Sequence, residues 1–177
     1  MIIGLTGKNA SGKGEVAKYL QKKGFIYYSL SDVIREEATK RGIEHSRDNL
    51  INLGNELRKK FDAGYLANEI NNKIMNDKEI FSERKNFFVV DSIRSPFEAK
   101  ELMKNKDFIL LGVRAPIELR FKRLLERNRL GDAKILEEFK KQEEKENLKS
   151  DTNQQLDETF KLADAIILKT QTDQLMS

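Results

Sequence analysis

Cysteine is absent from the 177-residue sequence, which excludes disulfide bonds and metal sites built from thiolates. Histidine occurs once, at His45 between Gly42 and a predicted helix, and we interpret it as an exposed loop residue rather than a catalytic one. No segment approaches the roughly 18 consecutive apolar residues of a membrane span, and no signal-peptide pattern opens the chain. These absences favour a cytoplasmic protein that does not act at a membrane.

Charge is plentiful but nearly balanced. The 33 lysines and arginines exceed the 29 acidic residues by four, and the sequence pI is about 9.1. This mild excess suits a small anionic substrate as well as nucleic acid, so composition does not choose between them. A chain of this length is expected to form one domain and to bury a sizeable core.

Residues 2–19 are the most informative segment. A short apolar run at 2–5 is typical of a buried parallel strand, and helical periodicity follows the loop. Between them Gly7 opens the spacing G-x-x-x-x-G-K, which ends at Lys13. Glycines let backbone N–H groups turn inward, and the N-terminus of a helix adds a partial positive charge. A plain glycine-rich turn is the alternative, but the order strand, loop and helix favours a phosphate site.

We predict that this loop binds the phosphates of ATP, with Lys13 as a catalytic, mobile positive charge for the β- and γ-phosphates. One position departs from the usual pattern, because Gly14 and Glu15 stand where a Ser or Thr hydroxyl normally contacts Mg²⁺. The metal must then be held by phosphates, water and carboxylates, which Mg²⁺ tolerates because it retains several waters. The predicted ATP-binding residues of this segment are Gly7, Asn9, Ala10, Ser11, Gly12, Lys13, Gly14 and Glu15.

A second apolar run, at 87–91, ends in a carboxylate. A buried strand at this place would deliver Asp91 to the carboxyl edge of the sheet, beside the phosphate loop. There the carboxylate can hold Mg²⁺, and we predict that it does so through water.

The residues after this strand predict the start of a helix. Ser95, Pro96 and Glu98 fall at the N-cap, N1 and N3 positions, which is the capping-box pattern with proline at N1. Arg94 is thereby placed in the turn directly above the sheet edge. Its guanidinium either bonds nearby carbonyls or binds a substrate phosphate, and we favour the phosphate.

Arginines gather in one other region, between residues 120 and 129, where there are four of them, and Asp132 follows. Lysine would serve solubility equally well, whereas the planar guanidinium suits polyphosphate binding and stacking on a base. The segment 137–149 is almost entirely Glu and Lys and predicts a solvated helix without chemistry. Earlier in the chain Asp32 and Arg35 lie three residues apart, a spacing typical of a surface ion pair.

Strands are predicted at 2–5, 25–28, 87–91, 108–113 and 163–168, with helical segments between them. This alternation predicts an α/β fold with a five-stranded parallel sheet and helices on both faces. The helical segments after Ser29 and after Arg120 are predicted to be insertions over the sheet edge rather than separate domains.

These motifs together resemble the P-loop nucleotide kinases of the adenylate kinase and dephospho-CoA kinase group, and most closely a set of little-characterised archaeal nucleotide kinases. The resemblance covers nearly the whole chain and implies a three-layer P-loop NTPase fold. It is carried by residues 7–14, 31–38, 91–96, 115–123 and 163–164. It also implies a core of residues 1–30, 82–127 and 148–177, an acceptor-binding insertion of residues 31–81, and a lid of residues 128–147.

The same resemblance implies roles for the arginines. Arg35 and Arg94 would hold the phosphate of the acceptor from two sides, with Arg129 of the lid as a third contact. Arg123 and Arg127 match a pair at the start of the lid, one against the adenine and one on the phosphates of ATP. Arg94 and Arg127 would also be catalytic, because they neutralise the charge of the transferred group.

We therefore predict ATP-dependent phosphoryl transfer to a nucleotide-like small molecule, with ATP and Mg²⁺ as cofactors. The acceptor would be a nucleoside or deoxynucleoside monophosphate or dephospho-CoA. A monophosphate needs no base, because its attacking oxygen is already anionic, whereas a hydroxyl acceptor needs one. Asp32 is the candidate base, and we count it as both acceptor-binding and catalytic.

Two other functional classes stay open. The missing hydroxyl is consistent with a non-catalytic or weakly hydrolytic ATP-binding switch that acts through a partner protein. A polynucleotide kinase or nucleic-acid binder, suggested by the basic pI, ranks low, because the arginines cluster where a nucleotide lid is expected and the 137–149 segment has mixed charge. The sequence is compatible with a monomer or a dimer.

Overall fold

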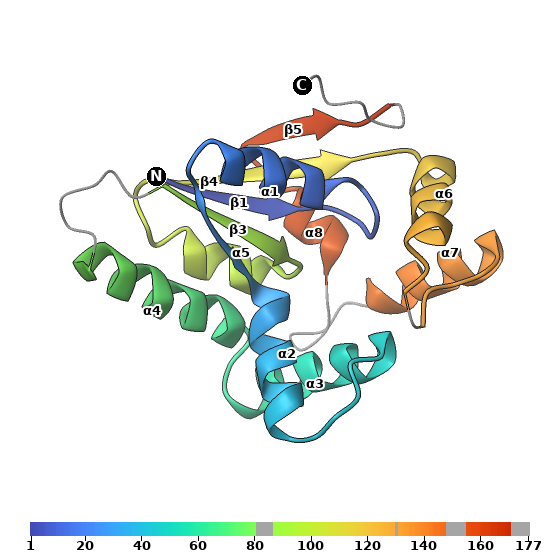
Figure 1. The fold of residues 1–177 in the computed structure, drawn as a ribbon, viewed down its shortest axis with the longest axis horizontal. Coiled ribbons are helices and arrows are strands. Elements are labelled where there is room, and N and C mark those ends of the chain that lie inside the picture. The colour runs from blue at the N-terminus through green and yellow to red at the C-terminus, as the bar shows by residue number, and fades with distance from the viewer. Residues whose placement is uncertain (81–86, 130, 148–154, 171–177) are drawn as a thin grey trace.

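The computed structural model describes residues 1–80, 87–129, 131–147 and 155–170, and Figure 1 shows its fold. Its strands form one parallel sheet in the order β2-β3-β1-β4-β5, which confirms the predicted sheet. The strands are β1 (Ile2–Thr6), β2 (Ile26–Ser29), β3 (Phe88–Ile93), β4 (Phe108–Arg114) and β5 (Ala165–Leu168). The helices of the described residues are α1 (Lys13–Lys22), α2 (Leu30–Lys40), α3 (Arg47–Lys60), α4 (Tyr65–Ile80), α5 (Pro96–Leu102), α6 (Ile117–Arg127), α7 (Leu136–Glu146) and α8 (Leu156–Phe160).

Apolar side chains fill two cores on opposite faces of the sheet, as the period of two along a strand requires. Val89 lies in a small core beneath α1, together with Leu5 and Ala17. Its neighbours Phe88 and Val90 lie in a larger core, to which helices α2, α3, α4 and α5 contribute. Helices therefore cover both faces, and the fold is the three-layer α/β arrangement of P-loop NTPases.

The helices α2 and α3 are placed by short polar signals at their starts. Helix α2 follows β2 directly, and the Oγ of Ser29 accepts a hydrogen bond of 3.2 Å from the Ser31 N–H. Helix α3 begins after Ser46, whose Oγ accepts from the Asn49 N–H at 3.3 Å. Such side-chain caps satisfy backbone donors that the first turn of a helix leaves open. The caps therefore fix where this helical segment leaves the sheet.

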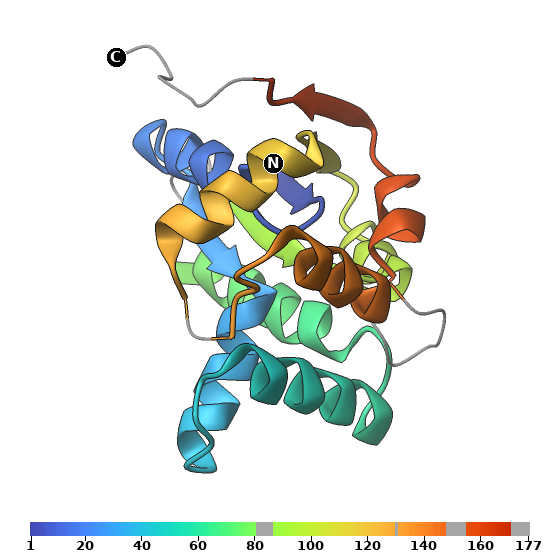
Figure 2. The same cartoon turned by 90° about the vertical axis from the view of Figure 1, so that its right-hand side faces the viewer.

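Helices α6 and α7 form a small cluster of their own, on the side of the molecule that faces the viewer in Figure 2. Phe139 of α7 is fully buried, with its ring centroid 5.9 Å from that of Phe121, and Glu143 is buried as well. The prediction of a wholly solvated helix over 137–149 is therefore wrong for one face of α7. The high Glu and Lys content concealed that face, which docks through the apolar side chains of Leu136 and Phe139 and through Glu143, paired with Arg120. Residues 148 and 149 lie outside the described residues.

Two of the predicted segment boundaries cannot be placed on the fold. The end of the insertion of residues 31–81 and the junction of lid and core at 147/148 fall at residues 81–86 and 148–154, outside the described residues. Helices α2 to α4 and helix α7 occupy the described parts of those two segments. Across the described chain, none of the helices combines the length and the apolar character that crossing a membrane requires.

Candidate functional site

The loop between β1 and α1 has a geometry that depends on glycine. Gly7 has a φ of 142°, and a Cβ at this position would lie 2.2 Å from the carbonyl oxygen of Val113. Gly12 has a φ of 103° and immediately precedes α1. The ammonium of Lys13 donates to the carbonyl oxygens of Gly7 at 2.6 Å and Lys8 at 3.1 Å. The loop thus curls around its own lysine.

Two side chains of this loop carry buried polar atoms that lack a hydrogen-bond partner within the described part of the chain. They are the Nδ2 of Asn9 and the Oγ of Ser11. A buried donor left unsatisfied costs about 1–3 kcal/mol, so such atoms are normally paired. Phosphate oxygens in the loop would supply acceptors, and the residues present therefore fit the phosphates of a nucleotide.

Two cavities adjoin this loop, and they share a wall. The first has a volume of about 640 Å³ and contains the loop, Asp91 and Tyr27 in its walls. The second, of about 470 Å³, has the apolar side chains of Ile34, Leu50 and Ile51 in its walls. The residues that line both cavities are Asn9, Ser31, Arg35, Arg94, Arg127 and Arg129. Four arginines thus surround the junction, where two anionic groups could meet.

Asp91 lies in the first cavity, near the end of β3. Its Oδ1 accepts a hydrogen bond of 2.6 Å from the Ser92 N–H, and the hydroxyl of Tyr27 lies 3.5 Å from its Oδ2. Burial, followed by the charge of Asp91, raises the pKa of the Tyr27 hydroxyl, which stays a neutral donor. The described residues include no cluster of three or more His, Asp or Glu that could hold a metal. The carboxylate of Asp91 is a hard oxygen donor in the cavity that contains the phosphate loop, and it fits a Mg²⁺ ion that takes its other ligands from phosphate and water.

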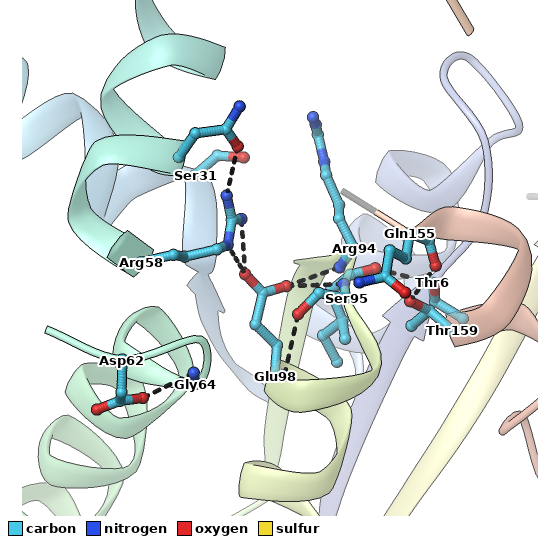
Figure 3. A network of polar contacts seen from close by, with 12 residues as sticks. Thr6, Ser31, Arg58, Asp62, Gly64, Arg94, Ser95, Glu98, Gln155 and Thr159 are labelled. Atoms are coloured by element: carbon cyan, nitrogen blue, oxygen red, sulfur yellow. Dashed lines mark hydrogen bonds and ion pairs between the residues drawn. The ribbon is translucent and has the colours of Figure 1, made fainter. Parts of the chain in front are cut away.

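The turn after β3 carries Arg94 and contains the predicted capping box. The Oγ of Ser95 accepts from the Glu98 N–H at 3.2 Å, and Glu98 accepts from the Ser95 N–H at 3.1 Å. Figure 3 shows that the Arg94 side chain extends away from this network, and Arg94 lines both cavities. The predicted position of Arg94 above the sheet edge is thus the one that the structure has.

Comparison with known proteins places the chain in a family. The family model described as "AAA domain" matches residues 3–149. A UPF0200 protein of Pyrococcus horikoshii is 35% identical over 175 residues, which cover 97% of this chain and 89% of that protein. A second one, of Pyrococcus abyssi, is 37% identical over 171 residues, or 95% of this chain and 87% of that protein. The chain belongs to the UPF0200 family.

The fold of this UPF0200 chain is also found in a solved kinase. Shikimate kinase from Bacteroides thetaiotaomicron superimposes with a TM-score of 0.54 and 15% identity, covering 95% of this chain and 86% of that one. At this identity the likeness concerns the fold alone. The prediction of a P-loop fold is confirmed at this level, whereas the adenylate kinase and dephospho-CoA kinase group stays a prediction.

Asp32 and Arg35 of this UPF0200 chain form an ion pair of 2.7 Å between Oδ1 and Nη1, with both side chains about half exposed. Arg35 lines both cavities, whereas Asp32 lines neither. The surface pair that the spacing indicates is therefore present, and it stands beside the junction. His45 is exposed, lies 3.0 Å from the Thr39 hydroxyl through its Nε2, and lines the second cavity.

The arginines of α6 differ in what they contact. The Nη1 of Arg123 lies 3.4 Å from the carbonyl oxygen of Ser11 in the loop and lines the first cavity. Arg120 lines neither of these two cavities, and its guanidinium pairs with buried Glu143 of α7 and donates to the Asn9 carbonyl at 3.3 Å. Arg120 therefore connects the phosphate loop with α7 and is a structural residue of the site.

Arg127 makes two parallel hydrogen bonds of 2.9 Å to Asp132, which Arg47 of α3 also contacts at 3.3 Å. Burial alone would raise the pKa of Asp132, but the hydrogen bonds and charge of Arg127, with the charge of Arg47, lower it below its usual range. Burial, followed by the charges of Arg127 and Arg35, lowers the pKa of Arg129. Positive charge is thus concentrated at the junction, and Asp132 offsets part of it.

Sequence reasoning missed two residues of the site, Tyr27 and Arg58. Tyr27 belongs to a strand predicted for its β-propensity alone, and only the pairing of Ser29 with Asp91 across β2 and β3 places it beside the carboxylate. Arg58 is 4% exposed and pairs with Glu98, 40 residues away. The sequence offers no local signal for either contact.

Proposed function

We propose that this UPF0200 chain transfers the γ-phosphoryl group of ATP to a nucleotide-like small molecule that carries its own phosphate. The observation that supports this most directly is the pair of adjoining cavities with Arg35, Arg94, Arg127 and Arg129 around their junction. Phosphoryl transfer needs little covalent chemistry from the protein, which has to align two anions and neutralise charge. Two sites joined at a cationic wall meet that requirement.

The phosphate loop would hold the β- and γ-phosphates of ATP. Lys13 would exchange the carbonyl oxygens of Gly7 and Lys8 for phosphate oxygens, since an ammonium on a flexible stem can turn from one set of acceptors to the other. Asn9 and Ser11 would donate their unpaired groups to the same anion. Mg²⁺, with phosphate, water and Asp91 around it, would supply further neutralisation of the charge on the phosphates.

The acceptor would occupy the second cavity. Its apolar wall of Ile34, Leu50 and Ile51 suits a flat base, and its arginines suit a phosphate group. Asp32 is engaged by Arg35 and lies outside the cavity walls, which favours an acceptor that needs no base. A nucleoside or deoxynucleoside monophosphate therefore ranks above dephospho-CoA, whose hydroxyl would require Asp32 as the base.

The kinase fold neighbour adds support for phosphoryl transfer as the reaction class, but at 15% identity it carries no information on the acceptor. The test is an ADP-release assay coupled to an optical signal, run with nucleoside monophosphates, deoxynucleoside monophosphates and dephospho-CoA. We expect at least one acceptor to stimulate ADP release, and Lys13→Ala to abolish that stimulation. Binding of ATP without stimulation by any of these acceptors would count against the proposal.

A second candidate function is an ATP-dependent switch that acts through a partner protein. It is favoured by Glu15, which replaces a magnesium-binding hydroxyl and pairs with Lys18 at 3.2 Å instead. Mass spectrometry of the acceptor separates the two functions, because a switch releases inorganic phosphate and leaves every acceptor unmodified.

A further inference from the structure

The turn that carries Arg94 is held by its backbone at both ends. The Arg94 N–H donates to the Oε2 of Glu98 at 2.9 Å, and the Arg94 carbonyl accepts from the Gln155 N–H at 2.8 Å. Upstream in the same turn, the Thr6 hydroxyl donates to the Ile93 carbonyl at 2.9 Å. Figure 3 shows these contacts together, with the guanidinium of Arg94 directed away from them. The direction of that side chain therefore depends on a fixed backbone.

Glu98 in turn is oriented by Arg58. Its Oε1 accepts from the Nε of Arg58 at 3.0 Å and from the Nη2 at 2.7 Å, and neither side chain is more than 3% exposed. A buried ion pair contributes little net stability, because desolvation of both charges offsets their attraction. A planar guanidinium on one oxygen does, however, fix the plane of the carboxylate and aim its other oxygen at the Arg94 backbone.

Arg58 also belongs to the helix that lines the second cavity. Arg47, Leu50 and Ile51 of α3 are in the wall of that cavity, and Arg47, Ile51 and Arg58 follow one another at helical spacing on one face. The same rigid helix therefore meets the acceptor cavity near its start and the Arg94 turn, through Glu98, near its end. A helix transmits position between these points because its backbone hydrogen bonds keep it rigid.

We propose that Arg58 and Glu98 are positioning residues that align Arg94 with the acceptor cavity. The pair fixes the position of Arg94, on the turn between β3 and α5, with respect to α3. Helix α3 lines the second cavity, which would receive the base and sugar of the acceptor. This inference rests on the proposed function, because it presumes that Arg94 binds the acceptor's phosphate. The competing explanation is that the pair only holds α3 against α5.

A double-mutant cycle separates these explanations, with a probe that does not require the acceptor to be known. Adenosine 5′-tetraphosphate carries one phosphate more than ATP, and this fourth phosphate reaches past the γ-position toward the arginine junction. The measured quantity is the ratio of the dissociation constants of ATP and the tetraphosphate, obtained by titration calorimetry. We expect Arg94→Ala to reduce this ratio by about tenfold, the worth of a charge-assisted hydrogen bond.

Arg58→Met should reduce the same ratio by about fivefold in the wild-type background and by less than twofold in the Arg94→Ala background. Contacts that act through one another are non-additive in this way, whereas a general loosening of the fold acts equally in both backgrounds. ATP affinity should change by less than twofold in each variant. Arg58→Lys keeps the buried charge and replaces the Met variant if that variant does not fold. We expect it to reduce the ratio by less than Arg58→Met does, with the same non-additivity between the two backgrounds.

Arg41→Met is the matched control. Arg41 also bridges two helices of this segment, through Glu37 of α2 and Glu56 of α3, but it is exposed and its ion pairs are with those two carboxylates. The ratio of the two dissociation constants measured for Arg41→Met should equal that of the wild type. The thermal unfolding temperature of every variant is measured first, and binding is then assayed well below the lowest of these temperatures.

The outcomes distinguish a failure of the proposed acceptor site from a failure of the positioning role of Arg58 and Glu98. A ratio unaffected by Arg94→Ala would remove Arg94 from the phosphate site and overturn both the proposed acceptor site and this inference. A reduced ratio for Arg94→Ala, with Arg58→Met acting equally in both backgrounds, would overturn the positioning role alone. Failure of both probes to bind the wild-type protein would overturn the proposed ATP site itself.

Discussion

Glu98 and Asp132 are two carboxylates that each hold arginines, and they differ in how they hold an arginine that lines the cavities. Glu98 is fully buried and accepts from the backbone of Arg94 and the side chain of Arg58. Asp132 stands at the wall of the second cavity and accepts from the guanidinium of Arg127 itself. Glu98 therefore fixes the backbone from which the Arg94 side chain extends. Asp132, in contrast, is hydrogen-bonded to the Arg127 guanidinium, a group that would bind phosphate. The two pairs should respond to mutation in opposite ways.

The largest expected effect is on stability, from Glu98→Ala. This change leaves the Arg58 guanidinium buried without its partner and removes the acceptor of two backbone N–H groups, so we expect the free energy of unfolding to fall by about 3–5 kcal/mol. Urea denaturation followed by circular dichroism measures it. Glu56→Ala, which removes an exposed partner of Arg41, is the control and should lose much less. Equal losses in the two variants would show that the burial of Glu98 has no special weight.

Arg94→Ala should have the largest effect on activity. The change removes a guanidinium from the junction of the two cavities, and the loss of one preorganised donor typically lowers turnover by about 100-fold. ATP affinity should stay nearly intact, because the loop contacts are separate. Steady-state kinetics with the best acceptor and calorimetry with ATP test the two halves of this prediction. Loss of ATP binding would place Arg94 in the nucleotide site instead.

Asp132→Asn should act in the opposite direction on binding. Without the carboxylate, Arg127 no longer has to exchange an ion pair for phosphate, so ATP should bind about fivefold more tightly, the worth of one net hydrogen bond. Fluorescence titration with a labelled ATP analogue measures this change. Weaker binding would show that Asp132 positions Arg127 for ATP and that the contrast with Glu98 does not hold.

The smallest expected effect is a dependence of stability on pH. The folded-state pKa of Asp132 is lowered, so its contribution is present above its unfolded value of about 3.9 and is lost as the pH falls through the folded value. The stability difference between wild type and Asp132→Asn should thus be constant at neutral pH and shrink below about pH 4. Urea denaturation of both proteins across this range tests it, and a difference that grows toward low pH would contradict the assigned ion pairs.

The sequence was sufficient for the parts of the molecule that rest on local rules. The strand–loop–helix order around Lys13 and the capping box at Ser95 follow from residues within a few positions of one another. The parallel sheet follows from the alternation of strands and helices along the chain. The placement of Arg94 was predictable for the same reason, since strand β3 and the cap fix the turn between them.

Contacts between distant segments were not predictable in this way. The pairing of Arg58 with Glu98 joins residues 40 apart, and that of Arg47 with Asp132 joins residues 85 apart. Phe139 gave no visible apolar stripe, because the residues on either side of it in 137–147 are charged or polar, and its apolar partners lie in other segments. A lone sequence shows which residues can ionise or stack, whereas their partners are chosen by the tertiary fold.

Arg120 gives the phosphate loop and the helix α7 a common anchor, because one guanidinium donates to the Asn9 carbonyl and to Glu143 at the same time. An outward rotation of α7 alone would separate Arg120 either from Glu143 or from the Asn9 carbonyl of the loop. The phosphate loop and α7 are therefore coupled through Arg120, and a displacement of either one is felt at the other.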